Sequence, residues 1–120
     1  MNGISLDLIE SRILQAVSKF HLEQQGRAPN HARAYFQEDI VVVYSSGIYT
    51  KTEEQLSGTE EGRKLIKSAR RELRSLTRRI IEEQISQILH RDVLRSFWDL
   101  DIRSGEQIEV YMLGPERQSE

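Results

Sequence analysis

Lys and Arg side chains crowd one stretch of the chain, residues 63 to 79, which reads RKLIKSARRELRSLTRR. Eight of these seventeen residues are basic and one, Glu72, is acidic, so the stretch carries +7 in a chain whose net charge is −2. Guanidinium groups bind carboxylates and phosphates through paired hydrogen bonds. The chemistry that this stretch offers is therefore the binding of anionic groups.

The bases form a stripe along one side of a predicted helix, because they recur at intervals of three or four residues. The stripe consists of Arg63, Lys67, Arg70, Arg74 and Arg78, with Lys64 and Arg71 at its margin. Each like-charged pair at this spacing costs a few tenths of a kcal/mol. From Lys67 to Arg74 no base has an acid three or four residues away, so we expect groups outside the helix to neutralise them.

Three kinds of anion are alternatives for this stripe. The first is the protein's own acidic residues, in the same chain or in a second subunit: Glu53, Glu54, Asp99, Asp101 and Glu109. The second is an acidic protein partner or a small anion. The third is nucleic acid, which is disfavoured because no aromatic residues interleave with the stripe and no glycine-rich clamp loop is present.

A second candidate anion site is the segment GRAPNHAR, residues 26 to 33. Its glycine permits a left-handed backbone and its proline stiffens the exit from the preceding helix. The candidate ligands are Arg27, His31, Arg33 and Arg71. The simpler alternative, which the composition favours, is a helix-to-strand turn with solvated cations.

Catalytic and metal-binding patterns are absent from the sequence. The three histidines lie far apart without metal-ligand spacing, and they are interpreted as surface or interface residues. Asp99 and Asp101 share a face of a predicted strand, where we expect salt bridges because Arg95 and Arg103 lie on the same segment. We therefore assign no catalytic residue, metal or cofactor, which favours a non-enzymatic role and leaves enzymatic activity open.

Length and composition set the class of protein. The 120 residues predict one domain, assigned to residues 1–115, with a polar tail at 116–120. The absence of cysteine excludes disulfides and thiolate catalysis and suits a reducing cytosol. No apolar run approaches the roughly 20 residues that span a bilayer, and the N-terminus lacks a signal-peptide pattern. We expect a soluble cytoplasmic protein with no membrane span.

The periodicity predicts an α+β fold. A helix is expected over residues 5–25, two strands at about 32–37 and 40–46, a helix from Thr59 to about His90, and a second hairpin over 93–113 that Gly114 and Pro115 end. This order indicates an antiparallel four-stranded sheet with the helices packed on one face. The arrangement helix–hairpin–long helix–hairpin also suggests a degenerate αββ duplication, with Val43-Tyr44 matching Val110-Tyr111 and Arg12-Ile13 matching Arg79-Ile80.

Two apolar patterns indicate surfaces that neighbours cover. Val41, Val42 and Val43 are consecutive, so at least one faces outward unless a partner covers that face, and we assign Val41 and Val43 to an interface. In the long helix, one face carries Leu65, Ala69, Leu73, Leu76 and Ile80, and a second face, about 100° away, carries Ile81, Ile85 and Ile88. The two halves of this helix are expected to meet different neighbours, or the helix to kink near 77–81.

Together these features resemble the MpsC-like family of small bacterial domains of unknown function. The resemblance rests on GRAP at 26–29, Asp39 before the apolar strand, GIYTKTEEQL at 47–56, EEGRKLIKSARREL at 60–73, and GEQIEVYML in the final hairpin. It covers nearly the whole chain, although Ala28 and Tyr49 depart from the family's usual residues. The family is named for a sodium-translocating, membrane-potential-generating system linked to bicarbonate uptake, so the resemblance implies an accessory role without a membrane span.

The leading hypothesis is a dimeric, non-enzymatic accessory or regulatory domain associated with membrane ion or bicarbonate transport, in which the arginine stripe, Val41 and Val43 bind a second copy or an acidic partner. The alternative is a small-anion sensor or enzyme that uses the Gly26–Arg33 loop. Binding of nucleic acid through the basic helix is the third hypothesis.

Overall fold

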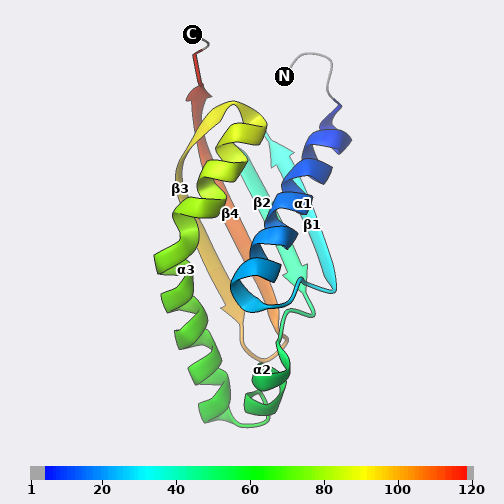
Figure 1. The fold of residues 1–120 in the computed structure, drawn as a ribbon, viewed down its shortest axis with the longest axis vertical. Coiled ribbons are helices and arrows are strands. Elements are labelled where there is room, and N and C mark those ends of the chain that lie inside the picture. Colours follow the sequence, from blue (N-terminus) through cyan, green and yellow to red (C-terminus); the bar gives the residue numbers. More distant parts are fainter. Residues whose placement is uncertain (1–4, 119–120) are drawn as a thin grey trace.

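The computed structural model describes residues 5–118, which form two long helices, one short helix and four strands (Figure 1). Their order is α1 (Leu6–Gln25), β1 (His31–Gln37), β2 (Ile40–Ser46), α2 (Lys51–Leu56), α3 (Glu60–Leu89), β3 (Arg91–Asp101) and β4 (Glu106–Glu116). The single domain assigned to residues 1–115 and the tail at 116–120 stay predictions, and residues 1–4 and 119–120 of them lie outside the described residues.

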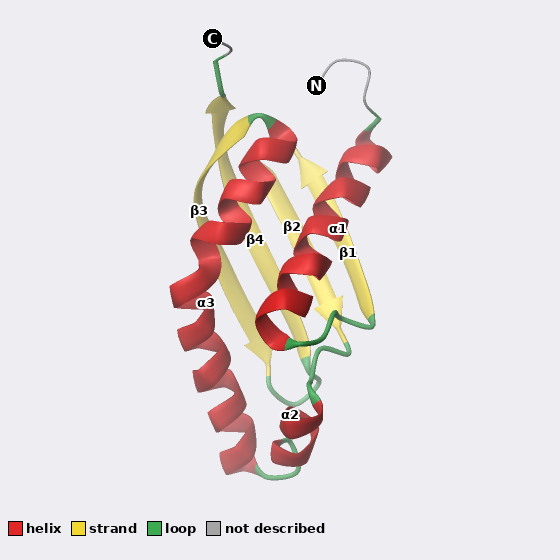
Figure 2. Ribbon diagram, in the orientation of Figure 1, coloured by secondary structure: helices red, strands yellow, loops and turns green. Residues whose placement is uncertain are grey.

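The four strands form one antiparallel sheet in the order β1-β2-β4-β3. Both long helices pack against the same face of this sheet, and no described helix covers the other face (Figure 2). The predicted α+β fold is confirmed. Below, the inner face is the sheet face that α1 and α3 cover, and the outer face is the opposite one.

Local capping interactions set several of the helix ends. The side chain of Ser5 accepts a hydrogen bond from Leu8 N, and Gly26 ends α1 in the left-handed region at φ 78°. Thr50 and Glu53 complete a capping box at the start of α2. Thr59 caps α3, which continues for 30 residues without interruption.

The second hairpin is longer than expected, because β4 continues through Gly114 and Pro115 to Glu116. The neighbouring strand β2 begins opposite Met112, so β4 extends beyond it toward its C-terminus. Pro115, which has no N–H to donate, therefore lies where β4 pairs with β3 alone. Pro115 does not end the strand, because a backbone N–H at this position would point toward the β2 side, where β4 has no neighbouring strand to accept it.

The core consists of two apolar clusters along α3. The larger joins α1, the inner face of the sheet and the C-terminal half of α3, where Ile81, Ile85 and Leu89 are fully buried. The smaller joins Ile48, Ile66 and Leu100 near the N-terminal end of α3. The expectation that the halves of α3 meet different neighbours is confirmed.

The first apolar face predicted for α3 is solvent-exposed, contrary to expectation. Leu65, Leu76 and Ile80 are 61%, 74% and 47% exposed. The helix instead directs Ile66, Arg70 and the residues that follow them at helical spacing toward the sheet. Below, the α3 apolar stripe means Leu65, Ala69, Leu73, Leu76 and Ile80.

Val41 and Val43, assigned to an interface, are fully buried in the larger cluster and cannot reach a partner. Because side chains alternate along a strand, Val42 takes the outward position between them. The expectation that one of the three valines faces outward is therefore met by Val42.

The αββ order occurs twice, as α1-β1-β2 and α3-β3-β4, with the second strand of each unit at the centre of the sheet. The matches at a spacing of 67 residues are nevertheless not structural equivalents. Ile13 is buried and Ile80 is exposed, whereas the neighbouring Ile81 is buried. Tyr44 likewise lies on the outer face and Tyr111 in the core. A shift of one residue reverses the face of a strand, so a spacing of 68 aligns the buried positions.

Candidate functional site

The arginine stripe of α3 faces the protein itself, and its central bases are neutralised within the chain. Arg70 pairs with Glu53, Arg74 with Glu109, and Lys67 with Asp99. The first of the three alternatives, the protein's own acidic residues, accounts for these bases. Arg70 and Arg74 are therefore not available to an external partner in this fold.

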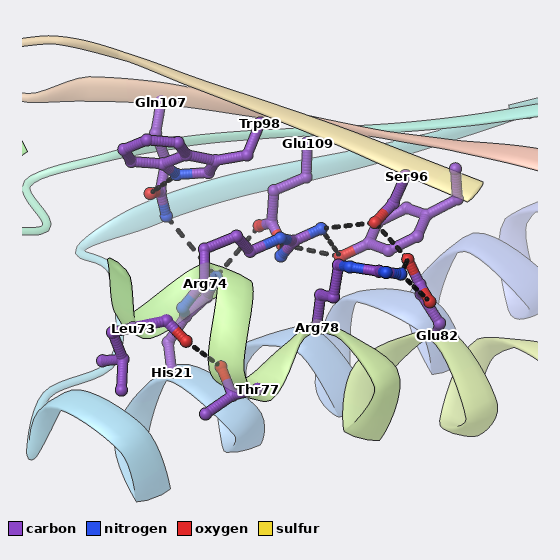
Figure 3. Close-up of polar contacts among 11 residues, drawn as sticks. His21, Leu73, Arg74, Thr77, Arg78, Glu82, Ser96, Trp98, Gln107 and Glu109 are labelled. Atoms are coloured by element: carbon purple, nitrogen blue, oxygen red, sulfur yellow. Dashed lines mark hydrogen bonds and ion pairs between the residues drawn. The ribbon is translucent and has the colours of Figure 1, made fainter. Parts of the chain in front are cut away.

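Glu109 lies at the centre of a polar cluster between the two apolar clusters. Its carboxylate lies 2.7 Å from Arg74 Nη1 of α3 and 2.9 Å from His21 Nε2 of α1 (Figure 3). The hydroxyl of Tyr111 donates to the same carboxylate at 2.6 Å. Three elements thus meet at one fully buried carboxylate.

The cluster continues from Arg74 toward the C-terminal half of α3. Arg74 Nη2 donates to Ser96 Oγ of β3, which in turn donates to Glu82. Arg78 donates to the same Glu82 carboxylate from one turn earlier on α3 (Figure 3). The polar cluster therefore comprises His21, Arg74, Arg78, Glu82, Ser96, Glu109 and Tyr111.

The charge states follow from these contacts. Burial alone would raise the pKa of Glu109, but the adjoining His21 and Arg74 lower it to about 2, so the carboxylate is ionised. Because an ionised carboxylate only accepts, His21 Nε2 carries the proton that it shares with Glu109. Burial and the negative charge of Glu109 raise the pKa of Tyr111 well above its ordinary value, so this phenol stays protonated and donates.

A second buried ion pair fixes the other end of α3. Arg70 donates twice to the Glu53 carboxylate, at 2.7 and 2.6 Å, and once to the backbone carbonyl of Ile48 at 3.0 Å. Glu53 also accepts from Thr50 N within the capping box. Although burial opposes it, the bonds from Arg70 and Thr50 lower the pKa of Glu53. One carboxylate thus both caps α2 and holds it against α3.

The polar cluster leaves little room for a ligand. A hollow beside it, lined by residues that include His21, Arg74 and Trp98, offers about 20 Å³, which is about the space of one water molecule. Trp98 Nε1 donates to Gln107 Oε1 at its wall. The arrangement holds opposite charges together in the core, and nothing larger than water fits beside them.

The candidate residues of the Gly26–Arg33 loop do not converge on one site. Arg27 donates to the Tyr49 carbonyl at 2.6 Å and to Asn30 Oδ1 at 2.8 Å, so it ties its loop to the segment before α2. His31 and Arg33 lie side by side on the outer face of β1. Arg71 is exposed on α3, which covers the opposite face of the sheet.

The remaining predicted residues have local roles. Arg63 donates to the Ser57 carbonyl, and Lys64 pairs with Glu60 one turn earlier. Asp99 forms a salt bridge, but with Lys67 rather than with a base of its own strand. Asp101 accepts from the backbone amide of Arg103 and so stabilises the turn before β4.

Sequence reasoning missed the role of His21, which was interpreted as a surface or interface residue and is buried in the core. It falls four residues after Val17 and eight after Ile13, on the buried side of α1, and this spacing is the signal that would have identified it. That Glu109 and Tyr111 lie on the same face of β4 could be predicted, because side chains alternate along a strand. Which helix residues contact them could not be predicted from the sequence.

No group of three or more His, Asp or Glu side chains in residues 5–118 is arranged to hold a metal ion. Within the same residues, no helix combines the length and the apolarity needed to cross a bilayer.

Comparison with known proteins identifies relatives over most of the chain. A family model described as "Na+-translocating membrane potential-generating system (MpsC)" matches residues 7–114. The uncharacterized protein YbcI of Bacillus subtilis (strain 168) is 29% identical over 105 residues, which cover 88% of this chain and 85% of the relative. No solved structure matches the chain.

Proposed function

Because the chain belongs to the MpsC family, we propose that it is a non-enzymatic accessory or regulatory domain of a sodium-translocating, membrane-potential-generating system. In this role it acts in the cytoplasm as a dimer, bound to the membrane subunits of the system. The bicarbonate link that the family resemblance implies extends the proposal to inorganic-carbon transport.

The observation that carries the proposal is the distribution of charged and apolar side chains. The charged side chains of the core, such as Arg74 and Glu109, pair with one another inside the protein. Large apolar side chains remain exposed on two separate surfaces, the α3 apolar stripe and the outer face of the sheet. Exposed apolar surface of this kind is characteristic of proteins that work by binding other proteins.

The test is a deletion of the coding gene in its host, with the membrane potential measured by a potential-sensitive dye with and without sodium. Loss of a sodium-dependent part of the potential, restored by the wild-type gene, is expected. Growth at limiting bicarbonate, measured in the same strains, examines the inorganic-carbon part separately. An unchanged potential at every sodium concentration would remove the proposal.

A second candidate function, the binding of a small anion, is supported by His31 and Arg33. They line a hollow on the outer face together with Tyr35 and Tyr44, and Arg33 has no ion pair among the described residues. Thermal melting with bicarbonate, phosphate and sulfate tests it, because a ligand bound only by the native state raises the melting temperature saturably. A saturable shift that Arg33→Ala abolishes would favour this function, and shifts of similar size in both proteins would exclude it.

A further inference from the structure

The outer face of the sheet is more apolar than a solvated sheet face normally is. Antiparallel sheets with one face in water alternate apolar and polar residues along each strand. In β2, however, Ile40, Val42 and Tyr44 point outward between inward-facing valines. In β4, Ile108, Val110 and Met112 also point outward. Along the middle of the outer face, the outward positions of both central strands are therefore apolar or aromatic, as in a sheet face that is covered rather than solvated.

The strand register aligns these side chains into straight rows across the sheet. Tyr35 of β1 pairs with Val42 of β2, Val42 with Val110 of β4, and Val110 with Phe97 of β3. This central row crosses all four strands without a polar residue. Its two ends, Tyr35 and Phe97, are 50% and 55% exposed, so two aromatic side chains stand in solvent at opposite edges of the face.

The neighbouring row carries opposite charges at its two ends. It consists of Arg33, Tyr44, Ile108 and Asp99, paired in that order from β1 to β3. The positive end lies at the β1 edge and the negative end at the β3 edge. Asp99 already contacts Lys67, but its side chain remains 74% exposed and can accept further hydrogen bonds.

We propose that a second copy of this chain covers the outer face, sheet against sheet, about a two-fold axis that runs along the strands between β2 and β4. This inference specifies the dimer of the proposed function, but it does not depend on the transport role. This two-fold rotation places the β1 edge of one copy over the β3 edge of the other. The residues of each row then face the same row of the partner copy.

The arrangement makes the face complementary to itself. Arg33 faces Asp99 of the partner copy, and Asp99 faces Arg33 of the partner copy, so the unlike ends of the row meet twice. Tyr35 likewise meets Phe97 of the partner copy, and Val42 meets Val110 of the partner copy. Two sheets packed in this way lie about 10 Å apart with their strands within about 30° of one another, as in β-sandwiches.

The first experiment measures the mass of the full chain by sedimentation velocity over a concentration series. The wild type is expected to be a dimer. Phe97→Glu places a carboxylate in the apolar row and is expected to raise the dimer dissociation constant at least about 100-fold. Leu76→Glu, at an exposed site on the α3 apolar stripe, is the matched control and should leave the dissociation constant unchanged.

A charge exchange tests the axis itself. Arg33→Glu creates two like-charged contacts and is expected to weaken the dimer about tenfold. Adding Asp99→Arg to Arg33→Glu restores opposite charges and should recover most of the loss. Both positions are outside the core, and circular dichroism checks that each variant is folded.

A monomeric wild type at every concentration would overturn the proposal, as would dissociation caused by Leu76→Glu but not by Phe97→Glu. If Phe97→Glu dissociates the dimer but Asp99→Arg fails to rescue Arg33→Glu, the proposed axis would be overturned. These outcomes are independent of the gene-deletion test, since a monomer can still serve the transport system and a dimer can form without it.

Discussion

Arg74 and Glu109 are 35 residues apart in the sequence, and their charged groups lie 2.7 Å from each other in the core. The pair joins α3 to the central strand β4, and His21 brings α1 to the same carboxylate. A buried ion pair thus lies where α1, α3 and β4 meet, with apolar clusters on either side.

Removing the charge of Glu109 should destabilise the fold strongly. Glu109→Gln leaves the buried Arg74 without a counter-charge, and breaking a buried pair in this way costs about 3–5 kcal/mol. Urea unfolding followed by circular dichroism measures the loss in the free energy of unfolding.

The matched control is the double variant Arg74→Met/Glu109→Leu, which removes both charges and keeps apolar volume. It should lose less stability than Glu109→Gln, because no unpaired charge remains buried. A double variant less stable than the single one would show that the hydrogen bonds of the cluster, rather than charge balance, dominate.

The same carboxylate predicts how stability depends on pH. The pKa of Glu109 is about 2 in the folded state against an ordinary value of 4.5. Its contribution to the free energy of unfolding is therefore fully present above about pH 4.5 and is lost as the pH falls toward 2. Between these values the unfolded chain binds a proton at Glu109 and the folded protein does not. The shift corresponds to roughly 3 kcal/mol. Urea unfolding at pH 7, 4.5 and 3 should show this loss, and an equal pH dependence in Glu109→Gln would contradict it.

Truncation of two adjacent isoleucines of α3 should reduce the free energy of unfolding by very different amounts. Ile81→Ala removes a fully buried side chain and is expected to cost about 2–5 kcal/mol. Ile80→Ala removes a half-exposed one from the α3 apolar stripe and should change the free energy of unfolding by no more than about 0.5 kcal/mol. Similar losses in both variants would mean that the stripe is covered in solution.

A substitution at Glu53 can separate its role in the capping box of α2 from its ion pair with Arg70. Glu53→Gln retains an acceptor for the capping box, since Gln also serves at this position, but removes the charge that Arg70 meets. We expect a loss of about 1–3 kcal/mol and faster amide exchange in α2. Glu54→Gln, at the neighbouring position, removes only an exposed ion pair with Arg27 and is the control, which should change the free energy of unfolding by no more than about 0.5 kcal/mol and leave amide exchange in α2 unchanged. Unchanged exchange in Glu53→Gln would show that Arg70 does not hold α2 in place.

Much of the fold follows from local patterns in the sequence. The Thr50–Glu53 capping box, the Thr59 cap and the left-handed Gly26 act over a few residues, so these three helix ends are determined by their own segments. Apolar spacing likewise identified both hairpins. The unpaired charge of the stripe also indicated that acids from outside the helix must meet it, and Glu53, Asp99 and Glu109 do so.

What only the tertiary structure decided is which face of α3 lies inward. Its N-terminal half offers two adjacent stripes, one of leucines and one of arginines, and periodicity favours burying the leucines. Arg70 and Arg74 face the sheet side because Glu53 and Glu109, from other elements of the fold, supply their buried counter-charges there. The free energy of burying a charge depends on partners that the chain brings together only when it folds. No local pattern in α3 contains that information.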